Sequence, residues 1–355
     1  MKTILIFFIL FGLNLLAEAK NFSSYFKMVK TIRLDPGKEI ISHFYPFFVD
    51  SKGNIIACDY RIGKVLLFDN DGHFLKFIAK SGRGPGEVLQ PFAGGMGIDD
   101  QLVIIDDAAR RVSFFDKEKK FVSSFFLNSI TQPGGLAVIS RNIIYMPTKV
   151  FHKKKDGNVS IDYIAKYDIN GTFIKSFFPV NKRLDGLVNT SRSKMLIIQN
   201  RIFAVQTHIF SISVLDTSGI EIKKFGKKPN YFVEQTDIRL TEAELNHKRI
   251  KAKRKLFKEL NEILTPIVGF FAIDEMLFIT SNVFHGEIDE RMDKIEIYSL
   301  EGEHIDGNID CNKMFFSTVG NDGFTYFVIG KEIEDMNTYY LLGKFKYIGP
   351  HLQNH

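Results

Sequence analysis

Cysteine is scarce and tryptophan is absent in this chain of 355 residues. The two cysteines, Cys58 and Cys311, are too few to form a disulfide scaffold. The nine histidines show no His-x-His or His-Glu-x-x-His spacing, which excludes the compact zinc motifs. A Gly-x-Ser-x-Gly segment is also missing, so the nucleophile elbow of one large hydrolase class is excluded.

A strong excess of charge of one sign is lacking as well, because the formal net charge is +6. This mild balance permits contact with acidic surfaces but does not indicate nucleic-acid binding, and we expect no nucleic-acid partner. Phenylalanine, in contrast, is abundant, with 35 copies. Aromatic residues are enriched in strands, so a chain rich in phenylalanine with few helix signals favours packed sheets.

The first residues have the features of an export signal. Lys2 supplies a positive start, residues 4–16 form an apolar run, and a small-x-small cleavage site ends at Ala19. The run is too short for a comfortable membrane span. We therefore expect a signal peptide at residues 1–19 and a protein that is exported to the periplasm or the cell exterior. An uncleaved anchor or a buried first strand is the alternative.

A sequence phrase of apolar runs separated by tight turns recurs along the rest of the chain. Its first copy, residues 54–80, reads NIIACDYRIGKVLLFDNDGHFLKFIAK. An apolar run, a polar break, a second run, an Asn-Asp-Gly turn and a third run form the pattern of a β-meander. Further copies cover residues 101–126, 162–178, 201–225, 276–305 and 324–345.

One turn of the phrase sets the period of the repeat. It is marked by Phe68-Asp69, Phe115-Asp116, Tyr167-Asp168, Leu215-Asp216, Tyr298-Ser299 and Phe345-Lys346. Most steps between these pairs are close to fifty residues, or about four strands per unit, which is typical of propeller blades. We therefore predict an all-β fold, a six-bladed β-propeller of four-stranded antiparallel blades over residues 20–355. A β-sandwich or several small β domains is the alternative.

Met28 to Leu34 reads as one more strand before the first unit, and we expect it to close the ring by pairing with the last blade. In such a ring a whole blade separates Cys58 from Cys311. This separation exceeds the Cα distance of about 7 Å that a disulfide allows, so both are expected to be free thiols. We expect the protein to be a monomer.

The first two units resemble NHL-type repeats, which follow the order Gly-Asn-apolar, Asp, Arg, then apolar-Phe-Asp. Residues 53–69 read GNIIACDYRIGKVLLFD, and residues 101–116 read QLVIIDDAARRVSFFD. Asp59 and Asp106 fall on the Asp position, and Lys64 and Arg111 fall on the Arg position. GRGPGE, at residues 82–87, is similar to a linker of bacterial six-bladed propellers, many of them exported. Blade four departs from the pattern, because Thr207 replaces the Asp.

This resemblance implies the fold, but it gives only weak information about the function. We expect Asp59 to pair with Lys64, and Asp106 with Arg111, as ties between strand ends. Quinone-dependent propellers rely on tryptophan docking between blades, and this chain has no tryptophan. No cofactor is expected.

The glycine-rich segment SGRGPGEVLQPF, residues 81–92, permits two interpretations. A phosphate loop would open into a helix whose N-terminal amides bind the anion, but no helical periodicity follows Glu87. The segment lies between the last strand of one unit and the first strand of the next. We therefore interpret its glycines as a linker that uses positive φ angles while the chain returns to the ring axis.

Loop lengths predict a working face. Antiparallel alternation puts the A–B and C–D turns of each blade on one face, and all of these are short. The opposite, long-loop face collects the B–C and D–A connections: the segment at 81–92 and residues 147–161, 227–266, 281–292 and 330–337. Functional residues concentrate on loops held by a rigid scaffold, so we expect the ligand here. The alternative is that these loops have no function.

The large insertion, residues 227–266, contains helix signals. Thr241 and Glu244 form a capping box, and Pro266 ends the pattern. One side of the predicted helix, residues 242–263, carries an apolar stripe, and the other is strongly basic. The stripe packs on the propeller in the simplest interpretation. An anionic partner or a membrane surface is the alternative for the basic side.

We predict an exported binding or scaffold protein that recognises a peptide, glycan or protein partner on this face. The candidate binding residues are Tyr60, Arg61, Arg110, Arg111, His208, His285 and Arg83, with Asp59 and Asp106 ranked lower. Arginine and tyrosine often dominate binding patches. The alternative is a lactonase-like, metal-dependent lyase or hydrolase with its site at the channel mouth, for which His208 and His285 are the best ligand candidates. A lone histidine is more often structural.

Overall fold

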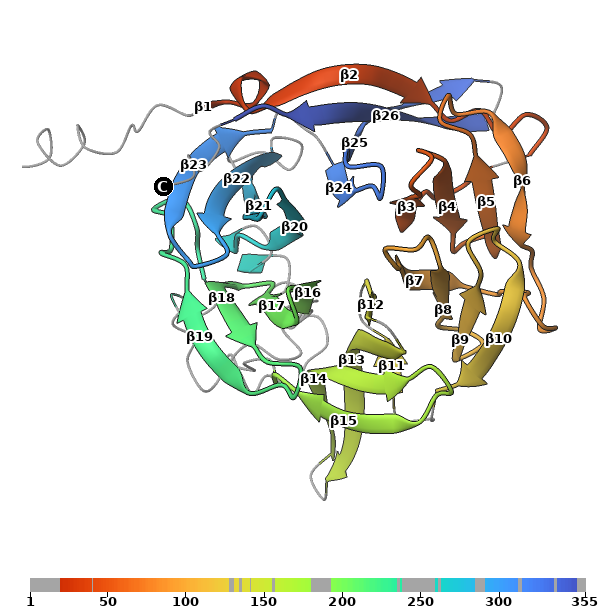
Figure 1. Cartoon of the computed structure of the whole chain (residues 1–355), viewed down its shortest axis with the longest axis horizontal. Helices are drawn as coiled ribbons and strands as arrows, with labels where there is room; N and C mark the ends of the chain where they lie inside the picture. The colour runs from red at the N-terminus through yellow and green to blue at the C-terminus, as the bar shows by residue number, and fades with distance from the viewer. Residues whose placement is uncertain are drawn as a thin grey trace, which may run out of the picture.

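The computed structural model describes residues 20–39, 41–127, 131–133, 136–140, 142–154, 157–179, 193–234, 237, 259–260, 263–284, 291–311, 315–334 and 337–349. Within these residues the chain forms six sheets, arranged as the blades of a ring (Figure 1). In each blade the strands are antiparallel neighbours in chain order from the centre of the ring outward, except that two strands from the start of the chain add to the outer edges of blades six and five. The predicted all-β, six-bladed propeller is confirmed.

The strands follow the order that the repeats predict. Blade one holds β3 (Phe47–Val49), β4 (Ile55–Asp59), β5 (Lys64–Phe68) and β6 (Phe74–Ala79). Blade two holds β7 (Pro91–Met96), β8 (Leu102–Asp106), β9 (Arg111–Phe115) and β10 (Phe121–Phe126). Blade three holds β11 (Thr131–Pro133), β12 (Val138–Ser140), β13 (Ile143–Lys154), β14 (Gly157–Asp168) and β15 (Phe173–Phe177).

The second half of the ring repeats the arrangement. Blade four holds β16 (Ser193–Ile198), β17 (Arg201–Gln206), β18 (Ile209–Leu215) and β19 (Glu221–Phe225). Blade five holds β20 (Ile267–Ile273), β21 (Met276–Phe284), β22 (Arg291–Ser299) and β23 (His304–Asp310). Blade six holds β24 (Phe315–Val319), β25 (Thr325–Glu334) and β26 (Asn337–Tyr347), completed by β2 (Phe26–Arg33).

The N-terminal segment closes the ring as predicted. β2 pairs antiparallel with β26 and forms the outer strand of blade six, so the two ends of the propeller lie side by side (Figure 1). β1 (Lys20–Asn21) adds to the edge of β23 in parallel, and the 3-10 helix η1 (Phe22–Ser24) joins it to β2. The first described residues therefore connect blades five and six.

Buried apolar side chains form a cluster at each junction between neighbouring blades. The cluster between blades five and six contains Phe26, Phe278, Phe327 and Phe345, all nearly inaccessible to solvent. Edge-to-face ring pairs, such as Phe26 with Phe278 at 5.9 Å between centroids, fill this space. Aromatic rings are large and pack well in this geometry, which explains why a propeller without tryptophan needs so much phenylalanine.

The turn that marked the repeat period also holds neighbouring blades together. Asp168 and Asp216 each accept backbone hydrogen bonds from the residues two and four positions later. Gly171 and Gly219, inside these turns, have φ angles of 87° and 82°. A Cβ at either glycine would overlap a ring on the preceding blade, Phe125 or Phe177 respectively. Glycine is therefore required twice over, by the backbone conformation and by the close approach.

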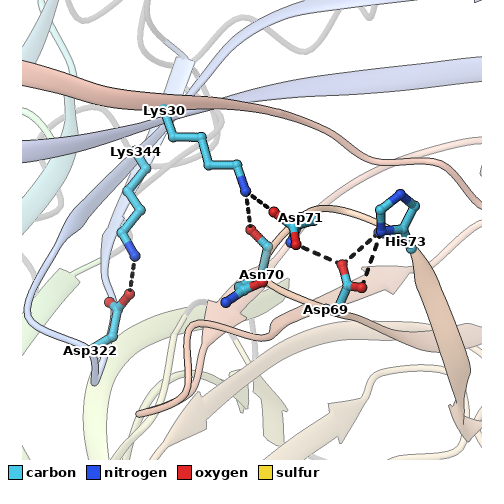
Figure 2. Close-up of polar contacts among 7 residues, drawn as sticks. All are labelled: Lys30, Asp69, Asn70, Asp71, His73, Asp322 and Lys344. Atoms are coloured by element: carbon cyan, nitrogen blue, oxygen red, sulfur yellow. Dashed lines mark hydrogen bonds and ion pairs between the residues drawn. The ribbon is translucent and has the colours of Figure 1, made fainter.

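Outer-strand lysines add a second tie on this short-turn face. Lys30 of β2 donates to the carbonyl oxygen of Asn70 on blade one and pairs with Asp71 (Figure 2). Lys76 donates in the same way to Glu118 of blade two, at 3.0 Å. Lys223 of blade four does so to Glu301 of blade five, at 2.6 Å. The closing strand therefore uses a tie that recurs at two ordinary junctions.

Three of the five predicted long loops are wrong as loops. The described parts of residues 147–161, 281–292 and 330–337 continue the strands of β13–β14, β21–β22 and β25–β26. β13 and β14 stay paired from Ile143 with Asp168 out to Lys154 with Gly157, past the end of β15 (Figure 1). Pairing satisfies the backbone amides and carbonyls that a loop would leave to water, so the polar segments extend the hairpins.

The helical insertion predicted between blades four and five is not confirmed. Most of residues 242–263 lie outside the described residues, and η1 is the only helical element defined within them. Helical backbone occurs at residues 259, 260 and 263, and the Leu264 amide donates to the Leu260 carbonyl at 2.9 Å. In the described part of the chain, no helix has the length and apolar character needed to cross a membrane.

Candidate functional site

The glycine-rich linker is part of the scaffold. The amide of Gly84 donates to Glu87 Oε2 at 2.7 Å, and the amides of Gly82 and Val88 close the loop by backbone bonds to Val88 and Lys80. No helix follows it, since the chain passes directly into β7. The segment is therefore a self-contained connection between blades one and two, and the interpretation as a linker is confirmed. The expected positive φ occurs at Gly86, at 75°, but not at Gly82 or Gly84, so that part of the prediction is corrected.

Asp59 is a buried anchor for the segment that leads into blade one. Its carboxylate is inaccessible to solvent and accepts the amides of Ser42, His43, Arg61 and Ile62, at 2.6 to 3.3 Å. It therefore ties the incoming chain to the B–C turn of the same blade.

Asp106 does the same in blade two. This carboxylate is also inaccessible and accepts the amides of Leu89, Gln90 and Ala109, at 2.5 to 3.0 Å. Because every one of these contacts is internal, Asp59 and Asp106 belong to the scaffold. Their place among the binding candidates is therefore corrected.

The expected partners of the two cations are also corrected. Lys64 and Arg111 face Asp59 and Asp106 in the backbone register, as predicted, but their side chains reach the incoming linkers. Lys64 Nζ lies 2.9 Å from Glu39 Oε2. Arg111, which is buried, donates from Nη1 to the carbonyl oxygen of Arg83 at 3.0 Å and from Nη2 to that of Glu87.

A linker carbonyl is a better partner for Arg111 than Asp106 is, because backbone amides already surround that carboxylate. The guanidinium holds the glycine-rich linker against blade two, so Arg111 also belongs to the scaffold. The side chain of Arg83 is exposed on the same linker. Arg110 is half-buried at a φ of 51°, and its carbonyl accepts the Leu127 amide at 2.7 Å.

Tyr60 and Arg61 belong to a cluster that spans three blades on the long-loop face. The cluster consists of His43, Tyr60, Arg61, Phe92 and Lys331, and we call it the aromatic–basic cluster. Ring centroids of His43 and Tyr60 lie 4.6 Å apart, and those of Tyr60 and Phe92 lie 5.6 Å apart, both edge to face. Arg61 and Lys331 are exposed beside these half-buried rings.

Chain topology explains why these residues meet. His43 precedes β3, Tyr60 and Arg61 follow β4, Phe92 lies near the start of β7, and Lys331 lies near the end of β25. All four of these strand ends point to the long-loop face of blades six, one and two. The sequence pattern indicated only Tyr60 and Arg61, because Phe92 and Lys331 come from other blades and His43 precedes the first repeat.

The electrostatics of the cluster favour a neutral imidazole between cations. Burial lowers the pKa of His43, repulsion by Arg61 and Lys331 lowers it further, and Asp59 opposes the shift. The exposed positive charge is therefore on Arg61 and Lys331, both close enough to act on His43, whose ring contacts Tyr60. Such a surface can pair with a carboxylate or other anion while it packs against an apolar or ring group.

The two histidine candidates fall in different places. His208 lies in the B–C turn of blade four with 7% of its surface exposed, and burial lowers its pKa to about 4. His285 lies outside the described residues. Across the described ranges, no three His, Cys, Asp or Glu side chains are grouped as a metal site would require.

Comparison with known proteins identifies the family. The model of the DUF5128 family, described as a 6-bladed beta-propeller, matches residues 14–330, and the chain belongs to this family. The narrower resemblance to NHL-type repeats is not confirmed by this match. No curated protein matches the chain.

Solved structures show the same fold at low sequence identity. A DUF4221 family member from Bacteroides vulgatus is 11% identical with a TM-score of 0.62, over 92% of this chain and 100% of that one. A Bacteroides fragilis protein, named as presumed to be exported, is 12% identical with a TM-score of 0.63, over 92% and 97%. Virginiamycin B lyase from Staphylococcus aureus is 13% identical with a TM-score of 0.52, over 92% and 90%.

Proposed function

We propose that this protein is an exported binding or scaffold protein that recognises a peptide, glycan or protein partner through the aromatic–basic cluster. The observation that carries the proposal is the meeting of His43, Tyr60, Arg61, Phe92 and Lys331 from three blades on one face. Exposed arginine beside aromatic rings is the composition of binding hot spots. The partner presents an acidic group to Arg61 and Lys331 and an apolar or ring group to Tyr60 and Phe92.

Export is part of this proposal. Its support is the apolar run at residues 4–16 with the small-x-small site that ends at Ala19, together with the name of the Bacteroides fragilis protein, which presumes that protein to be exported. The signal peptide itself lies outside the described residues.

The experiment is capture of the partner from an envelope extract of the source organism, followed by affinity measurement on purified components. Arg61→Ala is expected to weaken binding by about 1–3 kcal/mol without changing the melting temperature, because Arg61 is exposed. Lys52→Ala, on the opposite face, is the matched control and should bind as the unchanged protein does. Equal affinity for both variants would refute the proposal.

The competing function is a metal-dependent lyase or hydrolase at the channel mouth. Virginiamycin B lyase shares the fold, and a fold alone does not determine a reaction. Metal analysis of the purified protein separates the two functions. Stoichiometric Zn²⁺ or Ca²⁺ would favour the enzyme over the binding protein.

A further inference from the structure

The outer part of the ring contains a pocket between blades three and four, away from the aromatic–basic cluster. Its volume is about 340 Å³. The lining residues come from the end of β17, from β18 and β19 with the turn between them, and from the chain after β15: Phe178, Pro179, Gln206, Ile209, Ser211, Ser213, Leu215, Gly219, Glu221 and Lys224. Figure 1 shows these two blades as neighbours in the ring.

The repeat explains why a pocket opens at this junction. Lys64 and Arg111 stand four residues before the end of the third strand in blades one and two, and Ser211 holds that position in blade four. The long cations reach across to the incoming linker, at Glu39 for Lys64 and at Arg83 for Arg111. A serine is too short to do so, and the space beside it is retained as the pocket.

Ser213 is a second short polar residue on this strand. The equivalent position holds Leu66 in blade one, which is fully buried and part of the core between blades six and one, and Ser113 in blade two. Ser213 lines the pocket with 3% of its surface exposed, and its hydroxyl has no hydrogen-bond partner among the described residues. The Ser113 hydroxyl is also buried without a partner among them, but Ser113 does not line this pocket. A buried hydroxyl without a partner costs free energy, which a ligand in the pocket would recover.

The chemistry of the lining selects the kind of ligand. Ser211, Ser213 and Gln206 offer neutral donors and acceptors, and the charges of Glu221 and Lys224 at the rim cancel. Phe178, from the chain after β15, adds an apolar ring, and Ile209 and Leu215 lie on the same face of β18 as the two serines. The volume lies at the lower end of the range for small-molecule pockets, about 300–1,000 Å³.

Phe178 adds a structural signature to this wall. Its φ is 56°, a conformation that bulky residues rarely adopt and that is retained where the surroundings impose it. Phe178 is half-buried and lines the pocket, so this rarely adopted backbone conformation occurs at a residue of the pocket wall.

We propose that this pocket binds one unit of a neutral saccharide. A sugar ring has an apolar face that packs on Phe178, and hydroxyls at its edge that pair with Ser211 and Ser213. The inference is independent of the aromatic–basic cluster, because the two sites share no residue.

The test uses cellobiose, maltose and N,N′-diacetylchitobiose as probes in saturation-transfer difference NMR, with the dipeptide Gly-Gly as a probe of the other class. Ser211→Arg restores the long cation of blade two and should fill the pocket without unfolding the blade. Thr217→Arg adds the same charge at an exposed turn outside the pocket and serves as control. Ser213→Leu, which copies blade one, replaces Ser211→Arg if that variant does not fold.

At least one saccharide is expected to give a signal that is lost in Ser211→Arg, by at least tenfold, and retained in Thr217→Arg. The absence of signal from all three saccharides in the unchanged protein would overturn the proposal. So would a saccharide signal that survives Ser211→Arg. A Gly-Gly signal lost in Ser211→Arg, with no saccharide signal, would assign the pocket to a peptide instead.

Discussion

The ammonium group of Lys30 lies 3.1 Å from the carbonyl oxygen of Asn70, and through this contact the strand that closes blade six also holds blade one (Figure 2). Lys30 belongs to β2, whose backbone pairs with β26 from Phe26 to Arg33. The N-terminal strand thus completes one blade and is tied to the next.

Loss of this strand is therefore expected to destabilise the whole ring. A chain that begins at Ser42 lacks β1 and β2, so it exposes the edge of β26 and the rings packed around Phe26. Its melting temperature should fall by ten degrees or more, to judge from about 2–4 °C per kcal/mol. Lys30→Met is the matched control and should cost about 0–1 kcal/mol. Equal melting of the shortened and full mature chains would contradict ring closure.

The glycines of the C–D turns provide a second prediction. Gly171→Ala and Gly219→Ala combine a positive φ with overlap on Phe125 or Phe177. Gly323→Ala has a φ of 80° and no atom within 4 Å of the new Cβ, so it isolates the cost of the backbone conformation. We expect about 1 kcal/mol for the control and about 2–4 kcal/mol for the other two, in urea unfolding. Equal losses of stability in all three variants would show that the overlap with Phe125 or Phe177 adds no free-energy cost.

Asp59 and Asp106 should behave as scaffold residues. Asp59→Ala leaves buried amides, including those of Ser42 and His43, without their acceptor, and is expected to cost about 3 kcal/mol. Asp71→Ala removes an exposed carboxylate and should cost about 0–1 kcal/mol. Thermal melting of both variants checks the difference. A stable Asp59→Ala protein that has lost binding would return this residue to the site.

Burial of His208 predicts a dependence of stability on pH. Its pKa is about 4 in the folded protein, against an ordinary value of 6.5 that applies to the unfolded chain. Between these values the unfolded chain binds the proton and the folded protein does not, so stability falls as the pH falls through this window. The loss from this group is about 3 kcal/mol. His208→Gln should remove that part of the slope between pH 7 and pH 4.5, measured by urea unfolding, and an unchanged slope would refute the assignment.

The two thiols give a prediction that separates folded from unfolded protein. Cys58 and Cys311 are free and buried, and burial raises the pKa of both. Thiolates are the reactive form, so neither should react with iodoacetamide in the native protein. Both should react once the protein is unfolded without reductant. A mass that matches one disulfide would contradict the structure.

Much of the fold could be predicted because one turn of each blade requires a particular side chain. The aspartates at 69, 116, 168 and 216 recur with the spacing of the blades, since each caps the same turn with its carboxylate. The extended hairpins could not be predicted in this way. A two-stranded hairpin that is exposed to solvent needs no alternation of apolar and polar residues. The sequence of a polar segment such as residues 147–161 therefore resembles that of a loop.

The candidate site was less accessible to sequence reasoning. Asp59, Arg111 and Arg61 all stand beside the same kind of turn, and only their contacts separate scaffold from surface. Phe92 and Lys331 are distant in sequence from Tyr60, and the closed ring brings them together. Repeat patterns describe one blade at a time, whereas a site that spans blades depends on how the ring closes.

The account centres on the claim that the partner is bound on the long-loop face at the aromatic–basic cluster. The most direct measurement places the photo-crosslinking residue benzoylphenylalanine at position 60, where it keeps an aromatic ring and leaves Arg61 in place, and at position 117 on the opposite face, and exposes each protein to the envelope extract. We predict a crosslinked partner at position 60 and none at position 117. A partner captured at position 117, or none at position 60, would contradict the account.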